Sequence, residues 1–286
     1  MNHFLSLKDL TQEDISELFN MTDQIKNGDS KRVLEGKTFA LFFPNTSIRT
    51  RITFEKGIKE LGGECILFPP ESLNKKEKLS DVVGYLNQWI DGVIIRHPRF
   101  EVMNDLAEHA EIPIINAMSS ENHPCEIVAD LYTIRTMKPN FQELTYTFVG
   151  PPGNILNSWI EIAKVLGLTL QHVCSPGNRV CMDGQNYQFW AELEDKLVGS
   201  DVVLTDSLPP EYQTDDYIKK YQINLERMRL TNPGAILNPC PPFDRNQEVS
   251  ENVMQSDYFV GHYFKKNLLY VQQAIIIRSL GLSIEN

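Results

Sequence analysis

The strongest constraint on the fold is a regular alternation of short apolar runs with longer segments of helical periodicity. The apolar runs lie at residues 39–43, 65–68, 92–96 and 112–116, and then at 145–150, 169–174, 201–205 and 235–237. Between them come segments such as 79–89 and 101–109, where apolar side chains recur at helical spacing. Strands that alternate with helices of this length form parallel sheets, because each helix carries the chain back to the same end of the sheet. The sequence therefore predicts an α/β fold.

An interruption divides this alternation into two domains. Residues 126–137 have the pattern of one long helix, which Lys138-Pro139-Asn140 ends. The last apolar segment, 268–282, is long enough to return as a helix to the first domain. We therefore predict two doubly wound parallel-sheet domains joined by interdomain helices: residues 1–137 with the C-terminal helix 265–286, and residues 138–264. A chain of 286 residues allows each domain a core of its own.

The amino-acid composition limits the kinds of partner that the chain can bind. The formal charge of −11 argues against a nucleic acid or an anionic membrane surface as the main partner. No apolar run approaches the roughly 20 residues of a membrane span, and the first residues do not resemble a signal peptide. The five cysteines are scattered and lack Cys-x-x-Cys spacing, which favours a reducing cytosol over a disulfide framework or a zinc site. We expect a cytoplasmic protein with small-molecule ligands.

The segment from Phe43 to Arg51 lies between a predicted strand and a predicted helix. It places Ser47, Arg49 and Thr50 at the start of the helix, where N–H groups lack partners and the helix dipole is positive. Hydroxyl and guanidinium groups at such a point form a phosphate site. The alternative is that Ser47 or Thr46 only caps the helix, although a cap does not require the two arginines, Arg49 and Arg51, that follow.

These residues resemble a known motif. Ser47-Ile48-Arg49-Thr50-Arg51 is similar to the Ser-Thr-Arg-Thr-Arg carbamoyl-phosphate motif of the aspartate/ornithine carbamoyltransferase family. Arg96-His97 resembles the family's Arg-His, and His123-Pro124-Cys125-Glu126 resembles its His-Pro-Cys-Gln. With the second-domain matches given below, the resemblance covers most of the chain.

The resemblance implies an activity and roles for these residues. Carbamoyl phosphate would bind to Ser47, Ile48, Arg49 and Thr50, and the carbamoyl group would be transferred to the amino group of an amino acid or amine. Thr50, Arg96 and His123 would polarise the carbonyl and stabilise the oxyanion, which requires no cofactor and no metal. The alternatives are an exposed arginine at position 96 and a structural histidine at position 123.

Two positions depart from the family. Glu126 stands where the family has a glutamine that holds the carbamoyl NH2 group, and a carboxylate can accept a hydrogen bond there but cannot donate one. A cationic neighbour, a different transferred group, or drift at an exposed position would each explain it. Leu268 stands where ornithine enzymes supply an arginine to the carbamoyl group.

The second domain offers the acceptor residues. Asn154 matches an asparagine that binds the substrate's α-carboxylate in the ornithine branch, and Asp206 matches an aspartate that holds the α-amino group. The Ser-Met-Gly of that branch is absent, so we expect an amino-bearing acceptor other than ornithine. The alternative interpretation of Asp206 is that it only caps a helix or forms a turn. Pro239 and Cys240 lie where backbone carbonyl groups of the family accept hydrogen bonds from the carbamoyl NH2 group. The alternatives for Cys240 are a small buried thiol, which is the commoner case, and a nucleophile.

A lysine-rich loop, residues 72–81, resembles the mobile loop that reaches a neighbouring subunit's site in the aspartate enzymes. This resemblance implies a homotrimer with shared active sites, with Lys75 or Lys76 acting in trans; the alternative is a solvated loop. Three other functions remain open: a sensor that binds phosphate or carbamoyl phosphate without turnover, an enzyme that transfers a different group, and a dehydrogenase. The last is disfavoured because the Gly150 turn lacks Gly-x-Gly-x-x-Gly spacing.

Overall fold

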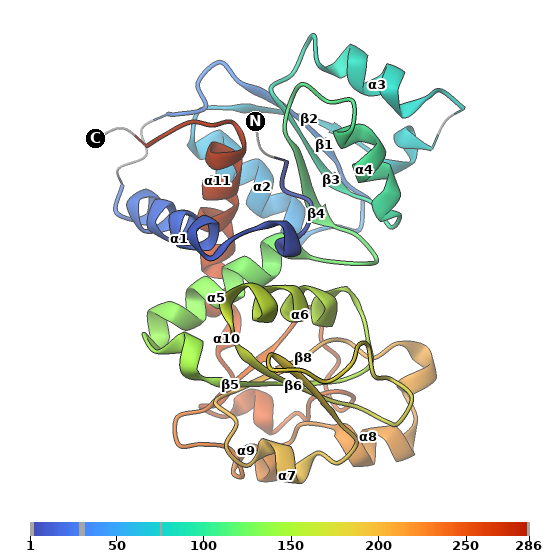
Figure 1. Ribbon diagram of the computed structural model, residues 1–286, viewed down its shortest axis with the longest axis vertical. Helices are drawn as coiled ribbons and strands as arrows, with labels where there is room; N and C mark the ends of the chain where they lie inside the picture. Colours follow the sequence, from blue (N-terminus) through green and yellow to red (C-terminus); the bar gives the residue numbers. More distant parts are fainter. Residues whose placement is uncertain (1–2, 29–31, 75, 285–286) are drawn as a thin grey trace. The chain divides into compact units, whose positions relative to one another are not determined.

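The computed structural model describes residues 3–28, 32–74 and 76–284. The chain forms two compact units, one made of Met1–Thr133 with Lys265–Asn286 and the other of Ile134–Phe264. It leaves the first unit within helix α5 (Pro124–Met137) and returns to it after Phe264 (Figure 1). No helix in the described ranges is both long enough and apolar enough to cross a membrane.

The first unit is built on a sheet with the strand order β2-β1-β3-β4. Its strands are β1 (Thr38–Phe42), β2 (Glu64–Phe68), β3 (Gly92–Arg96) and β4 (Ile114–Met118). Every pairing in this sheet is parallel. β4 begins later than the sequence predicts, because Pro113 has no N–H group to contribute to the ladder. Strand β2 lies at one edge and pairs only with β1 among the described strands.

Helices cover both faces of this sheet (Figure 1). They are α1 (Gln12–Lys26), α2 (Arg49–Glu60) and α11 (Leu268–Ser279) on one side, and α3 (Leu79–Leu86) and α4 (Phe100–Ala107) on the other. Residues that alternate along β1 face opposite sides, and Ala40 and Phe42 pack with Val83 and Met103 from α3 and α4. Burial on both faces explains why β1 and β3 are almost entirely apolar.

The C-terminal helix α11 packs against α1 and α2. Gln273 donates from Nε2 to the carbonyl oxygen of Gly57 at 2.9 Å, in the middle of α2. Arg278 forms ion pairs with Asp14 and Glu17 of α1. The last helix therefore packs in the same core as the N-terminal helix α1.

The second unit repeats the architecture with the strand order β7-β6-β5-β8-β9, again parallel throughout. Its strands are β5 (Thr145–Val149), β6 (Thr169–Val173), β7 (Tyr187–Trp190), β8 (Val202–Thr205) and β9 (Ile236–Pro239). Its helices are α6 (Asn154–Leu166), α7 (Glu194–Leu197), α8 (Asp215–Tyr221), α9 (Leu225–Met228) and α10 (Gly261–Phe264). The two parallel sheets confirm the predicted α/β class.

Candidate active site

The turn between β1 and α2 presents the predicted anion-binding segment. The residue before the helix is Ile48, and no side chain among the described residues caps the helix N-terminus. The hydroxyls of Ser47 and Thr50 are therefore not capping groups, and both residues are buried. Capping does not explain this segment. The first N–H groups of α2 remain suited to an anion.

Arg96 connects this turn to the neighbouring strand. It is the last residue of β3, which pairs with β1, so its side chain leaves the same edge of the sheet. Its Nη1 atom donates to Ser47 Oγ at 3.2 Å and to Thr50 Oγ1 at 3.4 Å. Arg96 is half-buried, and it is not a solvent-exposed surface arginine. The structure thus brings three of the predicted carbamoyl-phosphate residues together.

The next residue, His97, fixes the loops around Arg96. Its Nε2 lies 3.2 Å from Asn74 Oδ1, and its Nδ1 lies 3.1 Å from the backbone nitrogen of Arg99. Asn74 also accepts from Arg99 Nη2 at 2.8 Å. The start of the lysine-rich loop is thereby tied to the first unit. Lys76 is exposed, whereas Lys75 lies outside the described residues.

His123 lies between β4 and α5. Just before it, Asn122 Oδ1 accepts from Asn116 Nδ2 at 2.6 Å and from Ser119 Oγ at 2.8 Å, which fixes the turn. Burial lowers the pKa of His123 to about 4, and the positive charges of Arg96 and Lys265 act in the same direction. The imidazole is therefore neutral at physiological pH. A neutral imidazole can donate one N–H group to a carbonyl oxygen.

Glu126 is buried in the first turn of α5, so drift at an exposed position does not explain it. Its Oε1 atom lies 2.9 Å from Lys265 Nζ, which confirms the hypothesis of a cationic neighbour. Burial raises the pKa of Glu126, but the charge and hydrogen bond of Lys265, together with the charge of Arg49, outweigh burial and hold the pKa below its usual range. Leu268 is buried at the start of α11 and provides no charge.

Four predicted site residues lie along the carboxyl edge of the second sheet, two of them for the acceptor and two for the carbamoyl group. Asn154 begins α6 after β5, and Asp206 follows β8. Asp206 Oδ2 lies 3.8 Å from where a Cβ atom would stand on Gly153, so it is close to the start of α6. Asp206 also accepts from the N–H of Ser207 at 2.9 Å, as a turn former does.

The other two predicted site residues, Pro239 and Cys240, lie at the end of β9, which pairs with β8. Pro239 ends β9, and the N–H of Cys240 donates to the carbonyl oxygen of Thr205 at 2.9 Å. Cys240 is buried, as the thiol interpretation expects. This bond joins the end of β9 to the end of β8, directly before Asp206.

Sequence reasoning did not find Glu248. Its Oε1 accepts from the N–H of Asp244 at 2.6 Å, while Oε2 is buried without a hydrogen-bond partner in the described part of the chain. Burial raises the pKa of Glu248 to about 7, and the charges of Asp244 and Asp206 act in the same direction. The residue therefore lies near Asp206. Nothing in the local sequence distinguishes it from the many exposed acids.

The fold and these side chains define a two-domain α/β protein with a candidate anion site in one unit and a polar, acidic strand edge in the other. Residues 2–136 match the aspartate/ornithine carbamoyltransferase carbamoyl-P binding domain, and residues 142–278 match the Asp/Orn binding domain of the same family. The chain belongs to the aspartate/ornithine carbamoyltransferase family. Enzymes of this family transfer a carbamoyl group from carbamoyl phosphate to an amine, and the predicted transferase function is confirmed at that level.

Individual relatives agree with this assignment. The chain is 31% identical to an ornithine carbamoyltransferase of Desulfotalea psychrophila, over 98% of this chain and 99% of the relative. It is 30% identical to one of Syntrophotalea carbinolica, over 96% and 97% of the two chains. Among solved structures, the ornithine carbamoyltransferase of Burkholderia thailandensis superposes with a TM-score of 0.89 at 27% identity, covering 98% of this chain and 99% of that one.

Proposed function

We propose that this chain is an active carbamoyltransferase whose donor site lies at the start of α2 and whose acceptor is an amino-bearing small molecule. The observation that carries the proposal is the convergence of Arg96 on Ser47 and Thr50, with a neutral, buried His123 in electrostatic contact with Arg96. A surface arginine or a structural histidine would not create this arrangement.

The phosphate of carbamoyl phosphate would bind to Ser47, Arg49, Thr50 and the N–H groups of the first turn of α2. Thr50, Arg96 and His123 would polarise the carbonyl oxygen. An uncharged amine then attacks the carbonyl carbon, a C–N bond forms, and the C–O bond to phosphate breaks. The departing phosphate takes the proton that the amine loses, so no separate base is required. Catalysis is electrostatic stabilisation of the oxyanion by groups already in place.

The acceptor would bind through the second unit. Asn154 and Asp206 lie at the ends of two adjacent strands, and Glu248 adds a second carboxyl group near Asp206. Two acids favour an ammonium group and disfavour aspartate, whose carboxylates they would repel. We therefore propose a diamino acid, an N-acylated diamino acid or a diamine. The names of the relatives support an amino-acid acceptor.

We further propose that the enzyme is a cytoplasmic homotrimer, in which the loop at residues 72–81 reaches a neighbouring site. None of the five cysteines, all of which lie among the described residues, forms a disulfide, as a reducing compartment favours. Large apolar side chains at the edge strand β2 and at the start of α2 are partly exposed, by 37% to 65%; they are Ile48, Ile52, Ile66, Leu67 and Phe68. An exposed apolar edge of this kind favours association.

The test is turnover of carbamoyl phosphate against a panel of amines, with ureido products identified by mass. The panel contains ornithine, shorter diamino acids, N-acylornithines, putrescine and aspartate. We expect one amino-bearing member, other than aspartate, to give a product with release of phosphate. No product from any member, with carbamoyl phosphate still raising the melting temperature, would favour a sensor or a different transferred group.

A further inference from the structure

A buried ion cluster adjoins the candidate carbamoyl site. Lys265 Nζ lies 2.9 Å from Glu126 Oε1 and donates to Asp130 Oδ1 and Oδ2 at 2.6 Å and 2.8 Å. The side chains of Lys265, Glu126 and Asp130 are only 16%, 9% and 4% exposed. Lys265 comes from the segment through which the chain re-enters the first unit, so the cluster joins two distant parts of the sequence.

The charges explain why the lysine is required. Glu126 and Asp130 are four residues apart on α5, which places like charges on one helix face. Both are buried, and burying two carboxylates without a counter-charge is strongly unfavourable. Lys265 is the cation that contacts both, and its three N–H groups match the three oxygen contacts that it makes.

The same cluster acts on the site residues. Glu126 follows His123 by three residues, and the charges of Lys265 and Arg49 both favour the ionised form of Glu126. Lys265 lies against Oε1, which leaves the second oxygen of an ionised carboxylate able to accept from an amide NH2 group. At this position the family motif has glutamine, whose neutral amide needs no counter-charge.

We propose that Lys265 is a positioning residue for the donor, which holds Glu126 ionised and in place as the acceptor for the carbamoyl NH2 group. It acts through Glu126 and does not itself touch the reacting atoms. The inference rests on the proposed carbamoyl-phosphate site. The competing explanation is structural: Lys265 would only join the C-terminal segment to α5 through Asp130, and the identity of residue 126 would not matter.

A double-mutant cycle separates the two explanations. Lys265→Met, Glu126→Gln and the double variant are compared with wild type, and Lys266→Met is the control on the adjacent, exposed lysine. We expect Lys265→Met to raise KM for carbamoyl phosphate on the order of 10- to 100-fold, with a smaller change in kcat, because an uncompensated buried carboxylate then faces an anionic donor. In the Glu126→Gln background the same substitution should change KM by less than about threefold, because position 126 then carries no charge beside the donor and Asp130 lies one turn further along α5.

Affinity at different pH values gives a second readout. Without Lys265, Glu126 loses the partner that favours its charge, so its pKa rises. Lowering the pH from 8 to 6 should then protonate Glu126 and shrink the ratio of the variant's Kd for carbamoyl phosphate to that of wild type, measured by calorimetry. A purely structural lysine would leave that ratio independent of pH. Equal losses from Lys265→Met in the wild-type and Glu126→Gln backgrounds, or a constant ratio, would overturn the proposal.

The Kd values measured by calorimetry also distinguish a failure of this proposal from a failure of the proposed function. If wild type binds carbamoyl phosphate but gives no ureido product, the proposed turnover fails, and the cycle in Kd still decides the role of Lys265. If wild type turns over and the cycle is additive, only the role of Lys265 fails. If wild type neither binds carbamoyl phosphate nor turns it over, both fail.

Discussion

His123 shows at the scale of one residue how burial sets the charge of a proposed catalytic group. Burial and two nearby cations keep the imidazole neutral, so it can donate to an oxyanion without adding a charge to the free site. One such donor is typically worth about 3 kcal/mol in the transition state. We expect His123→Ala or Arg96→Ala to lower kcat by roughly two to three orders of magnitude. Steady-state kinetics measures this, with melting temperature as the control for folding. Turnover at the wild-type level in either variant would remove that residue from the mechanism.

The same lowered pKa makes a prediction about acid stability. An unfolded chain binds a proton at His123 as the pH falls through 6.5, whereas the folded chain does so only near pH 4. The stability linked to neutral His123 is therefore complete above pH 6.5 and is lost as the pH falls toward 4. Between pH 7 and pH 5 wild type should lose about 2 kcal/mol more than His123→Gln. Urea unfolding at the two pH values measures the difference. His172, whose pKa is also lowered to about 4, is retained in both proteins and cancels.

Single residues also show what the sequence could not reveal. Glu126 was recognised as a departure from its motif, but its partner lies 139 positions later (265 − 126), and no local pattern links the two. Glu248 carries no motif, and only the folded chain shows that one of its oxygens is buried without a partner among the described residues. Arg96 and Ser47 were predictable, because both follow parallel strands and the ends of adjacent strands share one edge of the sheet.

At the scale of elements, continuous apolar runs were the most informative signal. The strands β1, β3, β5 and β8 are buried on both faces, and each was predicted within one residue at either end. β7 was missed because it is an edge strand whose sequence, Tyr-Gln-Phe-Trp, alternates between buried and more exposed positions. In α2 the isoleucines at 48 and 52 have helical spacing but are 65% and 56% exposed, so spacing alone did not identify the core face.

Helix α1 allows a test of local sequence signals at this scale. Thr11 Oγ1 accepts from the N–H of Asp14 at 3.1 Å, and Asp14 Oδ2 accepts from the N–H of Thr11 at 2.7 Å, so the two residues form a capping box. Thr11→Ala should lower the free energy of unfolding by about 1 kcal/mol. Ser16→Ala, on the exposed side of the same helix, is the control and should raise stability by up to about 0.5 kcal/mol, because alanine has the higher helix propensity. Chemical denaturation measures both; equal stabilities for the two variants would show that the cap contributes nothing.

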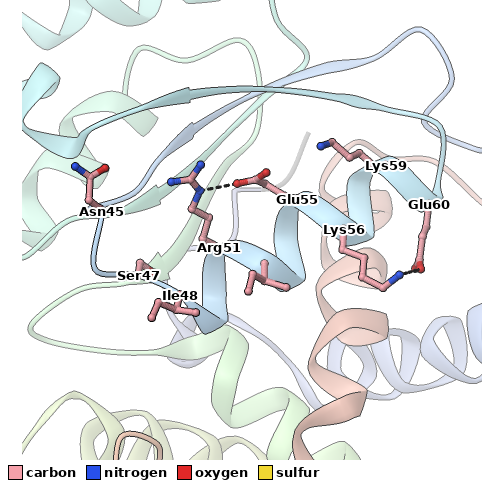
Figure 2. Close-up of a pocket in the computed structure, with 9 residues that line it drawn as sticks. Asn45, Ser47, Ile48, Arg51, Glu55, Lys56, Lys59 and Glu60 are labelled. Carbon is pink, nitrogen blue, oxygen red and sulfur yellow. Dashed lines mark hydrogen bonds and ion pairs between the residues drawn. The ribbon is translucent and has the colours of Figure 1, made fainter.

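At the scale of the whole molecule, the first unit has an exposed apolar side that runs along α2 and strand β2. A pocket on the exposed side of α2 is lined by the residues shown in Figure 2, and four of its charged members pair along the helix, Arg51 with Glu55 and Lys56 with Glu60. The charges within each pair neutralise one another, and Lys59 adds one positive charge. The surface therefore combines isoleucines, an edge strand and little net charge, which suits contact with a second copy of the chain.

The proposed trimer can be tested on this surface at a residue that is not assigned to the donor site. Ile52 is 56% exposed and faces away from the core, so Ile52→Glu should fold normally but place a carboxylate in the subunit interface. We expect sedimentation to shift from a trimer to a monomer at micromolar protein concentration. Met182→Glu, at an exposed position of the second unit, introduces the same charge elsewhere and should leave the trimer intact. Because the loop at residues 72–81 is proposed to act on a neighbour, the Ile52→Glu monomer should also lose turnover while retaining phosphate binding. An Ile52→Glu protein that sediments as wild type would place the interface on another face, and a fully active monomer would show that each chain completes its own site.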